Sequence, residues 1–350
     1  MTKFTYKNLN AHDILDRVIA RERDFAKISY HSLSFFEKCN YLLNYNILIH
    51  PSIKDKRFRA RAYAELKPEL MRYAAQGDHR GMYFMAMLSG PNDLDPAIAR
   101  EYIKCASERY APAITERIFL KLRCGKDIDR EACELVNSLN EFIYDESEDE
   151  MHRLRALNAS RKVLKTRLGD EAAYAIRYID DERFNLAARG NFFAIQGMAY
   201  RARVKLEAEP YAEVSDEARA EYDFWQTALT LVYDHYATLG VSGHYVELSR
   251  RLATGMGCEV DEERSISLLV DGILVYQGGV GHIALTELEA QCDRLEKVKP
   301  CIPRIVHAFL AEDREALTAA VTEAYKSGHR CSAIRAHSMI AVAEHRGRVI

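Results

Sequence analysis

Proline and glycine are scarce in this chain, which has 350 residues but only eight prolines and 17 glycines. Both residues interrupt regular helices, so their scarcity leaves long unbroken segments. Within those segments the apolar residues recur with a period of about 3.6 residues rather than 2, which is the spacing of one face of a helix. The sequence therefore predicts an all-α protein.

Long apolar runs are also missing. Residues 1 to 25 carry charges wherever the hydrophobic stretch of a signal peptide would stand, and no later segment has the length of a membrane-spanning helix. We therefore expect a cytoplasmic protein that does not enter a membrane. The formal net charge of -3 gives no general reason to expect binding to nucleic acid or to anionic lipid.

The motifs of metal, hydrolytic and cofactor chemistry are absent as well. The eight cysteines are scattered without a CxxC pair, which is typical of buried free thiols in a reducing compartment. There is no His-Glu-x-x-His and no Gly-x-Ser-x-Gly motif. Gly255-Met256-Gly257 follows a predicted helix and lacks the third glycine of a dinucleotide loop and the Gly-Lys-Ser/Thr ending of a triphosphate loop. We interpret it as a turn between helices, and we expect no cofactor, no metal and no catalysis.

Residues that typically cap the start of a helix stand where the helical periodicity begins. Ser215 can cap a helix whose buried stripe comprises Ala218, Tyr222, Trp225, Leu229, Val232 and Tyr236. Asp261 is placed to cap a second helix, and Asp95 followed by Pro96 is placed to begin a third. Each predicted helix thus has a local reason to begin where its apolar stripe begins.

One spacing of small and apolar residues recurs along the chain. A glycine is followed four positions later by a small residue, and an apolar and a small residue stand one turn further on. The segments are Gly77, Gly81, Met85 and Ala86; Gly190, Ala194, Met198 and Ala199; Gly240, His244, Leu248 and Ser249; and, more weakly, Gly328, Ser332, Ala336 and His337. In the last two segments a histidine, His244 or His337, replaces one of the small residues. A neighbouring helix can approach closely along such a stripe.

A glycine turn and an acidic cap follow several of these stripes. The turns are Gly90 before Asp95, Gly125 before Asp129, and Gly255-Met256-Gly257 before Asp261. Glycine can adopt the positive φ that ends one helix, and aspartate can begin the next. The pattern predicts helical hairpins, which bury their inner faces by stacking on one another.

The segment from Gly240 to Leu269 resembles the Sel-one-like repeat, a branch of the tetratricopeptide-like superfamily. The matching positions are Gly240, Leu248, Ser249, Leu252, Gly255, Gly257, Asp261 and Leu268, and residues 77 to 113 and 190 to 202 match less fully. The resemblance implies a right-handed α-solenoid of about six to eight hairpins. It also implies an adaptor that holds a partner protein in a curved surface, as such proteins typically do, and some bacterial members act in toxin, effector or signalling systems.

The domain organisation follows from where this pattern holds. The first 70 residues do not fit it, although they contain apolar helical segments, so we expect an N-terminal helical cap over residues 1 to 70. The repeats would occupy residues 71 to 345. The acidic run at 144 to 150 is the best candidate for a flexible joint within them.

The partner surface is predicted from the helix positions that the small-residue stripe leaves free. Aromatic and arginine side chains dominate binding energy at protein interfaces. The candidate residues are Arg80, Tyr83, Phe84, Met87, Arg201, Tyr245 and Arg250. The alternative for Phe84 and Met87 is a place in the core. The sequence thus favours a scaffold that binds a protein or peptide without chemistry.

Two other functions stay open at this point. A helical hydrolase or nuclease could use His244 and Glu247, which lie three positions apart, whereas Asp180-Asp181-Glu182 is interpreted as a solvated helix start or turn. A nucleic-acid regulator could use two basic segments, and the alternative for both is a solvated face balanced by acids such as the 145 to 150 run. Their basic residues are Lys54, Lys56, Arg57, Arg59 and Arg61, and Arg153, Arg155, Arg161, Lys162, Lys165 and Arg167.

Overall fold

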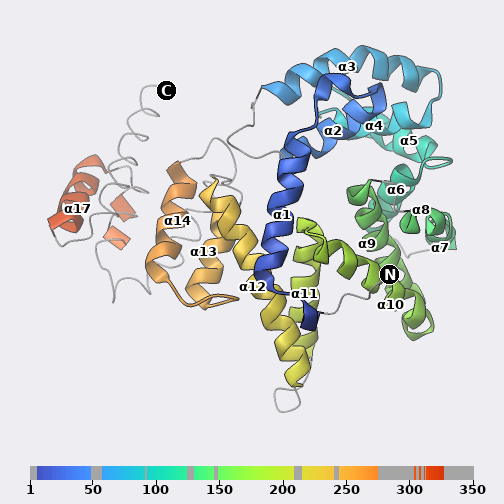
Figure 1. The fold of residues 1–350 in the computed structure, drawn as a ribbon. Coiled ribbons are helices and arrows are strands. Elements are labelled where there is room, and N and C mark those ends of the chain that lie inside the picture. Colours follow the sequence, from blue (N-terminus) through green and yellow to red (C-terminus); the bar gives the residue numbers. More distant parts are fainter. Residues whose placement is uncertain are drawn as a thin grey trace. The chain divides into compact units, whose positions relative to one another are not determined.

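The computed structural model in Figure 1 contains only helices and loops in the described part of the chain, which confirms the all-α prediction there. The structure describes residues 6–48, 57–90, 93–123, 130–145, 149–208, 215–239, 244–274 and 313–326, with a few single positions between 303 and 311. The chain divides into two compact units, Met1–Arg201 and Ala202–Ile350, here called unit 1 and unit 2. Each is described by itself.

Unit 1 holds most of the described helices. They are α1 (Ala11–Ala26), α2 (Phe35–Leu48), α3 (Phe58–Ala75), α4 (His79–Leu88), α5 (Pro96–Ala106), α6 (Ala111–Arg123), α7 (Arg130–Asn137), α8 (Asn140–Tyr144), α9 (Glu150–Arg167) and α10 (Ala173–Ala188). Short 3-10 turns stand at η1 (Tyr6–Asn8), η2 (Tyr30–Ser32) and η3 (Gly169–Ala172). Helix α11 (Phe192–Ala208) begins in unit 1 and ends in unit 2.

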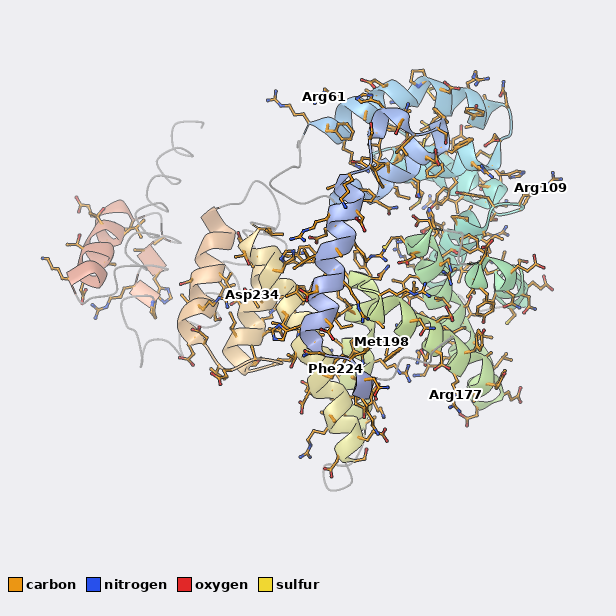
Figure 2. The ribbon with its side chains drawn as sticks, in the orientation of Figure 1. Arg61, Arg109, Arg177, Met198, Phe224 and Asp234 are labelled. Atoms are coloured by element: carbon orange, nitrogen blue, oxygen red, sulfur yellow. The ribbon has the colours of Figure 1, made fainter. Side chains whose placement is uncertain are left out.

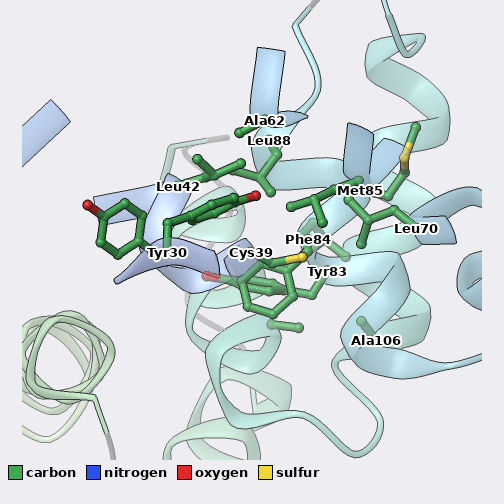
Figure 3. Packing of buried hydrophobic residues seen from close by; sticks show 14 residues of the cluster. Tyr30, Cys39, Leu42, Ala62, Leu70, Tyr83, Phe84, Met85, Leu88 and Ala106 are labelled. Atoms are coloured by element: carbon green, nitrogen blue, oxygen red, sulfur yellow. The ribbon is translucent and has the colours of Figure 1, made fainter. Parts of the chain in front are cut away.

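The core of unit 1 gathers around α4. This helix packs against α2, α3 and α5, and α5 in turn packs against α6. Tyr83 and Phe84 of α4 are 0% and 2% exposed, and Figure 3 shows them among side chains from the surrounding helices. Residues from both sides of position 70, such as Leu42 and Met85, share this core.

A second group of helices in unit 1 surrounds α9. Helices α6, α7, α8 and α10 all contact it, and η3 connects it to α10. Its inner face consists of small and apolar residues that are fully or almost fully buried, namely Leu154, Ala156, Leu157, Ala159 and Val163. Other positions of α9 carry the basic side chains noted in the sequence, and one of them, Arg153, is buried with the apolar residues.

Unit 2 is built on α12 (Asp216–Thr238), α13 (Tyr245–Thr254) and α14 (Glu262–Leu274), and α17 (Arg314–Lys326) lies further along the chain. Helix α13 packs against both α12 and α14. Trp225 of α12 is 0% exposed, as its place in the predicted stripe requires. Between α13 and α14 the contact is close, because the hydroxyls of the buried Ser249 and Ser265 lie 2.8 Å apart.

The predicted helix starts are confirmed. The side chain of Ser215 accepts a hydrogen bond from the amide of Ala218 at 3.1 Å. The carboxylate of Asp95 accepts one from Ala97 N at 2.6 Å, with Pro96 in the first helical position. Asp261 likewise accepts from Arg264 N at 2.9 Å. Each acceptor satisfies an amide that has no partner within its own helix.

The segment Gly255-Met256-Gly257 is the turn that the sequence predicts. Gly255 ends α13 in the left-handed region at φ 72°, where an L side chain is strained. Gly257 has the same φ and also lies against α12, where an added Cβ would stand 2.6 Å from the backbone nitrogen of Thr227. The turn therefore joins two helices and brings the chain onto a third.

Two of the predicted small-residue stripes mark close helix approaches. A Cβ on Gly81 would lie 2.5 Å from Cβ of Tyr73 in α3. A Cβ on Gly190 would lie 2.7 Å from the backbone of Arg17 and Val18 in α1. Glycine at these places lets neighbouring helices come into contact.

Several predictions concern residues outside the described part of the chain. These are the turn at Gly125 and Asp129, the first glycine of the third stripe at Gly240, and the whole fourth stripe. The middle of the acidic run, residues 146 to 148, is also outside it, while Tyr144 ends α8 and Asp149 caps α9. No helix in the described part of the chain combines the length and the hydrophobicity that a membrane span requires.

Candidate functional site

The four candidate residues on α4 do not share one environment. Arg80 is exposed and holds its guanidinium 5.7 Å from the ring centre of Phe36. Tyr83 and Phe84 point into the core, and Met87 is half-buried against the same cluster. In this structure the two aromatic rings are not available to a partner, which is the alternative that the sequence left open for Phe84.

The other three candidates lie on α11 and α13. Tyr245 is buried, at 6% exposure, whereas Arg250 is exposed and lies 4.0 Å from Glu247. Arg201 is half-buried and forms an ion pair with Asp180 at 3.2 Å. The seven candidates are divided between the two units, and among them Arg80 and Arg250 are the exposed ones.

His244 and Glu247, the pair proposed for hydrolysis, contact different neighbours. The imidazole of His244 is stacked on Tyr236, with ring centres 4.9 Å apart. Burial lowers the pKa of His244 to about 4, so the ring is neutral near pH 7. The carboxylate of Glu247 lies 3.3 Å from the guanidinium of Arg251. This arrangement holds α13 in place and does not favour acid–base work near neutral pH.

The burial of His244 predicts that unit 2 loses stability in acid. Its pKa is about 4 in the folded chain and 6.5 when unperturbed, so between these values the unfolded state binds more protons. The free energy of unfolding therefore falls as the pH falls through 6.5 toward 4. We expect the free energy of unfolding to fall by about 2 kcal/mol. The partial contact of the His244 ring with solvent makes this loss smaller than the whole difference in pKa would give.

Urea denaturation followed by the fluorescence of Trp225, the only tryptophan, measures this loss at several pH values. The variant His244→Phe keeps a ring against Tyr236 but cannot take up a proton. It should lose most of the slope between pH 6.5 and 4. An equal slope in the variant and the parent chain would assign the acid sensitivity to other groups.

Arg251 forms a buried polar network in unit 2 that the sequence pattern did not predict. Its Nη1 donates to the side-chain oxygens of Gln226 at 3.0 Å and Thr230 at 3.2 Å, both on α12. Thr230 donates in turn to the carbonyl of Met256 at 2.9 Å. An arginine between Leu248 and Leu252 on an otherwise apolar face was the available signal. The network joins α12, α13 and the glycine turn.

A second buried network joins α2, α4 and α9 in unit 1. The ring Nε2 of His152 lies 3.0 Å from Oδ1 of Asn40, whose amide donates to Asp149 at 3.1 Å. The hydroxyl of Tyr83 is 3.5 Å from the other ring nitrogen. Burial lowers the pKa of His152, which keeps the imidazole neutral. The chain of polar groups contains no nucleophile of the serine or cysteine type, and its role here is to position helices.

The two basic segments do not form one uniform cationic face. Lys54 and Lys56 lie outside the described residues, and Arg59 donates to the carbonyl of Leu42 at 3.2 Å. On α9, Arg153 is buried and donates to the carbonyl of Ile143 at 3.0 Å, while Arg155 donates to Glu116 at 2.9 Å. The carboxylates that pair with Arg153 and Arg155 are those of Glu182 and Glu116, which belong to other helices.

Asp180 is the centre of a cluster of charged side chains in unit 1. The sequence placed Asp180-Asp181-Glu182 at a solvated helix start or turn, and that prediction is wrong, because they lie inside α10. The Asp180 carboxylate is 8% exposed and pairs with Arg161 at 2.7 Å, Arg183 at 3.1 Å and Arg201 at 3.2 Å. Three cations from α9, α10 and α11 therefore meet at one buried carboxylate.

Arg183 is the most deeply buried of these three cations. Its side chain is 11% exposed, and burial lowers the pKa of its guanidinium. Its Nε is enclosed and has no hydrogen-bond partner within the described residues. Arg161 and Arg201 reach outward, with side chains 25% and 37% exposed.

A cavity of about 400 Å³ opens beside this cluster, between α9, η3, α10 and α11. Its charged lining consists of Arg161, Lys165, Arg177 and Arg201, opposed by Asp170 and Asp180. Figure 2 marks Arg177 on α10. We call this cavity the arginine groove. The larger hollow of about 770 Å³ is bordered, within the described residues, by α17 alone.

Comparisons with known proteins give no assignment. No protein-family model, no curated protein and no solved structure matches this chain. Within the described residues, no group of three or more histidine, cysteine, aspartate or glutamate side chains is placed to hold a metal ion.

Proposed function

We propose that this chain is a non-catalytic helical scaffold that binds a protein or peptide partner on an exposed surface. Helices that follow one another in sequence pack together from α3 to α6 and from α12 to α14. Repeat proteins use this neighbour-to-neighbour packing, in which each element contacts mainly the next. This packing supports the solenoid that we propose, a right-handed α-solenoid of Sel-one-like hairpins. We extend the proposal to a bacterial toxin, effector or immunity setting.

The observation that carries the proposal is a group of exposed tyrosines on unit 1. Tyr144, Tyr174 and Tyr178 are 40%, 85% and 47% exposed. The rings of Tyr144 and Tyr178 are 4.9 Å apart in an edge-to-face arrangement, and Tyr174 stands one turn before Tyr178 on α10. Single exposed apolar residues are ordinary, but a contiguous aromatic group marks a binding surface. We call these residues the tyrosine patch.

We propose the tyrosine patch as the partner surface instead of the aromatic residues that were predicted from the sequence. Tyr83, Phe84 and Tyr245 are buried, whereas Tyr174 and Tyr178 hold large ring areas in solvent. Tyrosine loses little conformational entropy on binding and supplies both apolar area and a hydroxyl. A protein surface is the kind of partner that uses both properties.

The test first identifies the partner and then measures its affinity. A photo-crosslinking amino acid at position 174 in native cells should give one discrete protein adduct. With that protein purified, the double variant Tyr174→Ser with Tyr178→Ser should raise the Kd by about 30-fold or more, as expected for loss of an aromatic hot spot.

A matched control removes exposed apolar side chains elsewhere in unit 1. Met71 on α3 and Ile98 on α5 are 54% and 48% exposed, and the double variant Met71→Ser with Ile98→Ser should leave the Kd unchanged within about twofold. If both double variants bind equally well, or if no adduct forms at position 174, the tyrosine patch is not the partner surface.

A further inference from the structure

The arginine groove has a surplus of positive charge among the described residues that line it. Its lining contributes four cations and two carboxylates, a net charge of +2. Asp180 is shared with a further cation, Arg183, which is not among the residues that line the groove. Lys165 and Arg177 are exposed and form no ion pair with any described residue. A cavity with this surplus favours an anionic ligand.

The groove also presents donors in fixed positions. Arg161 uses Nε and Nη2 on Asp180 at 2.7 and 3.3 Å, which leaves its Nη1 for another acceptor. Arg201 uses Nη1, which leaves Nε and Nη2. Because the buried carboxylate holds both guanidinium groups in place, a ligand does not have to order them, and the entropy cost of binding is reduced.

Charge and size together select the ligand. A phosphate monoester carries about −1.5 to −2 charges at neutral pH and three strong acceptor oxygens, which matches the surplus and the arginine donors. A carboxylate or a phosphodiester carries only about one negative charge. The volume of about 400 Å³ is in the range of small-molecule sites, and Ala173 and Ile176 supply an apolar wall.

We propose that the arginine groove binds the phosphate monoester of a small phosphorylated metabolite of the sugar-phosphate type. The phosphate lies among Arg161, Lys165, Arg177 and Arg201, and the organic part lies against Ala173 and Ile176. On α10 the groove is lined by Ala173, Ile176, Arg177 and Asp180, whereas the tyrosine patch uses Tyr174 and Tyr178. The two sites use different side chains, so either proposal can fail without the other.

The test adds ribose 5-phosphate, the probe, to the full chain and measures its binding by titration calorimetry and phosphorus NMR. We expect saturable binding of one molecule per chain, no binding of ribose, and weaker binding at pH 5 than at pH 7.5, because the ester loses its second charge below a pKa of about 6. Inorganic phosphate should bind more weakly because it cannot use the apolar wall. Absence of saturable binding overturns the proposal, and equal binding of inorganic phosphate overturns its ester component.

The deciding variant is Lys165→Gln with Arg177→Gln, because both side chains are exposed and neither supports the fold. The Kd for ribose 5-phosphate should rise at least about tenfold. The control Lys162→Gln with Arg109→Gln removes the same charge from exposed residues that do not line the groove, and it should bind like the parent chain.

Two further outcomes overturn the proposal. Equal losses in the two double variants would mean that only the net charge of the chain matters. Binding of a single-stranded oligonucleotide that depends on Lys165 and Arg177, without binding of ribose 5-phosphate, would assign the groove to nucleic acid instead.

Discussion

Replacing Asp180 by alanine will lower the free energy of unfolding by about 3 to 5 kcal/mol, the usual cost of leaving a buried charge without its partner. Arg183 is the reason, since its side chain is 11% exposed and its Nη1 lies 3.1 Å from the lost carboxylate. Arg161 and Arg201 are more exposed and can turn toward water. The loss should therefore be local to α9, α10 and the start of α11.

Hydrogen exchange of the α9 and α10 amides, together with urea denaturation followed by circular dichroism, measures this loss. Asp181→Ala is the matched control, because Asp181 is the adjacent, exposed residue of the same helix, and its effect should stay within about 0.5 kcal/mol. Adding Arg183→Met to Asp180→Ala should recover part of the stability, since it removes the unpaired charge. Equal effects of Asp180→Ala and Asp181→Ala would contradict the assignment.

Gly257→Ala is expected to destabilise unit 2 by about 2 to 5 kcal/mol. The left-handed conformation at φ 72° alone costs an alanine about 1 to 2 kcal/mol. The added Cβ would also press on the backbone of α12 at Gln226 and Thr227, which cannot turn aside as a side chain can. The glycine turn and α12 would have to separate.

Gly255→Ala provides the comparison, because Gly255 has the same φ but a different neighbour. An added Cβ there would meet the side chain of Val260 at 3.1 Å, which can move, so the cost should stay near about 1 to 2 kcal/mol. The fluorescence of Trp225, one residue before Gln226, reports the unfolding of this region. Equal destabilisation by the two variants would show that φ alone matters and that the contact with α12 does not.

The candidate sites could be predicted from the sequence only in part. The basic stretch of α9 was predicted to be either a nucleic-acid surface or a solvated face balanced by acids such as the 145 to 150 run, whereas Arg155 and Arg161 pair with Glu116 and Asp180 of other helices. No local pattern distinguishes Tyr83, which is buried, from Tyr174, which is 85% exposed. Both stand in helices with neighbouring apolar residues, and only the packing of whole helices decides which ring meets solvent.

The sequence by itself determined the local features of this protein. The caps at Asp95, Ser215 and Asp261 and the left-handed turn at Gly255 depend on groups a few residues apart, so their side chains and φ preferences settle them. The tertiary structure alone decided the burial of Asp180, the place of the tyrosine patch and the arginine groove. Burial and electrostatic pairing depend on which helices meet, and those contacts join residues that are far apart in the chain.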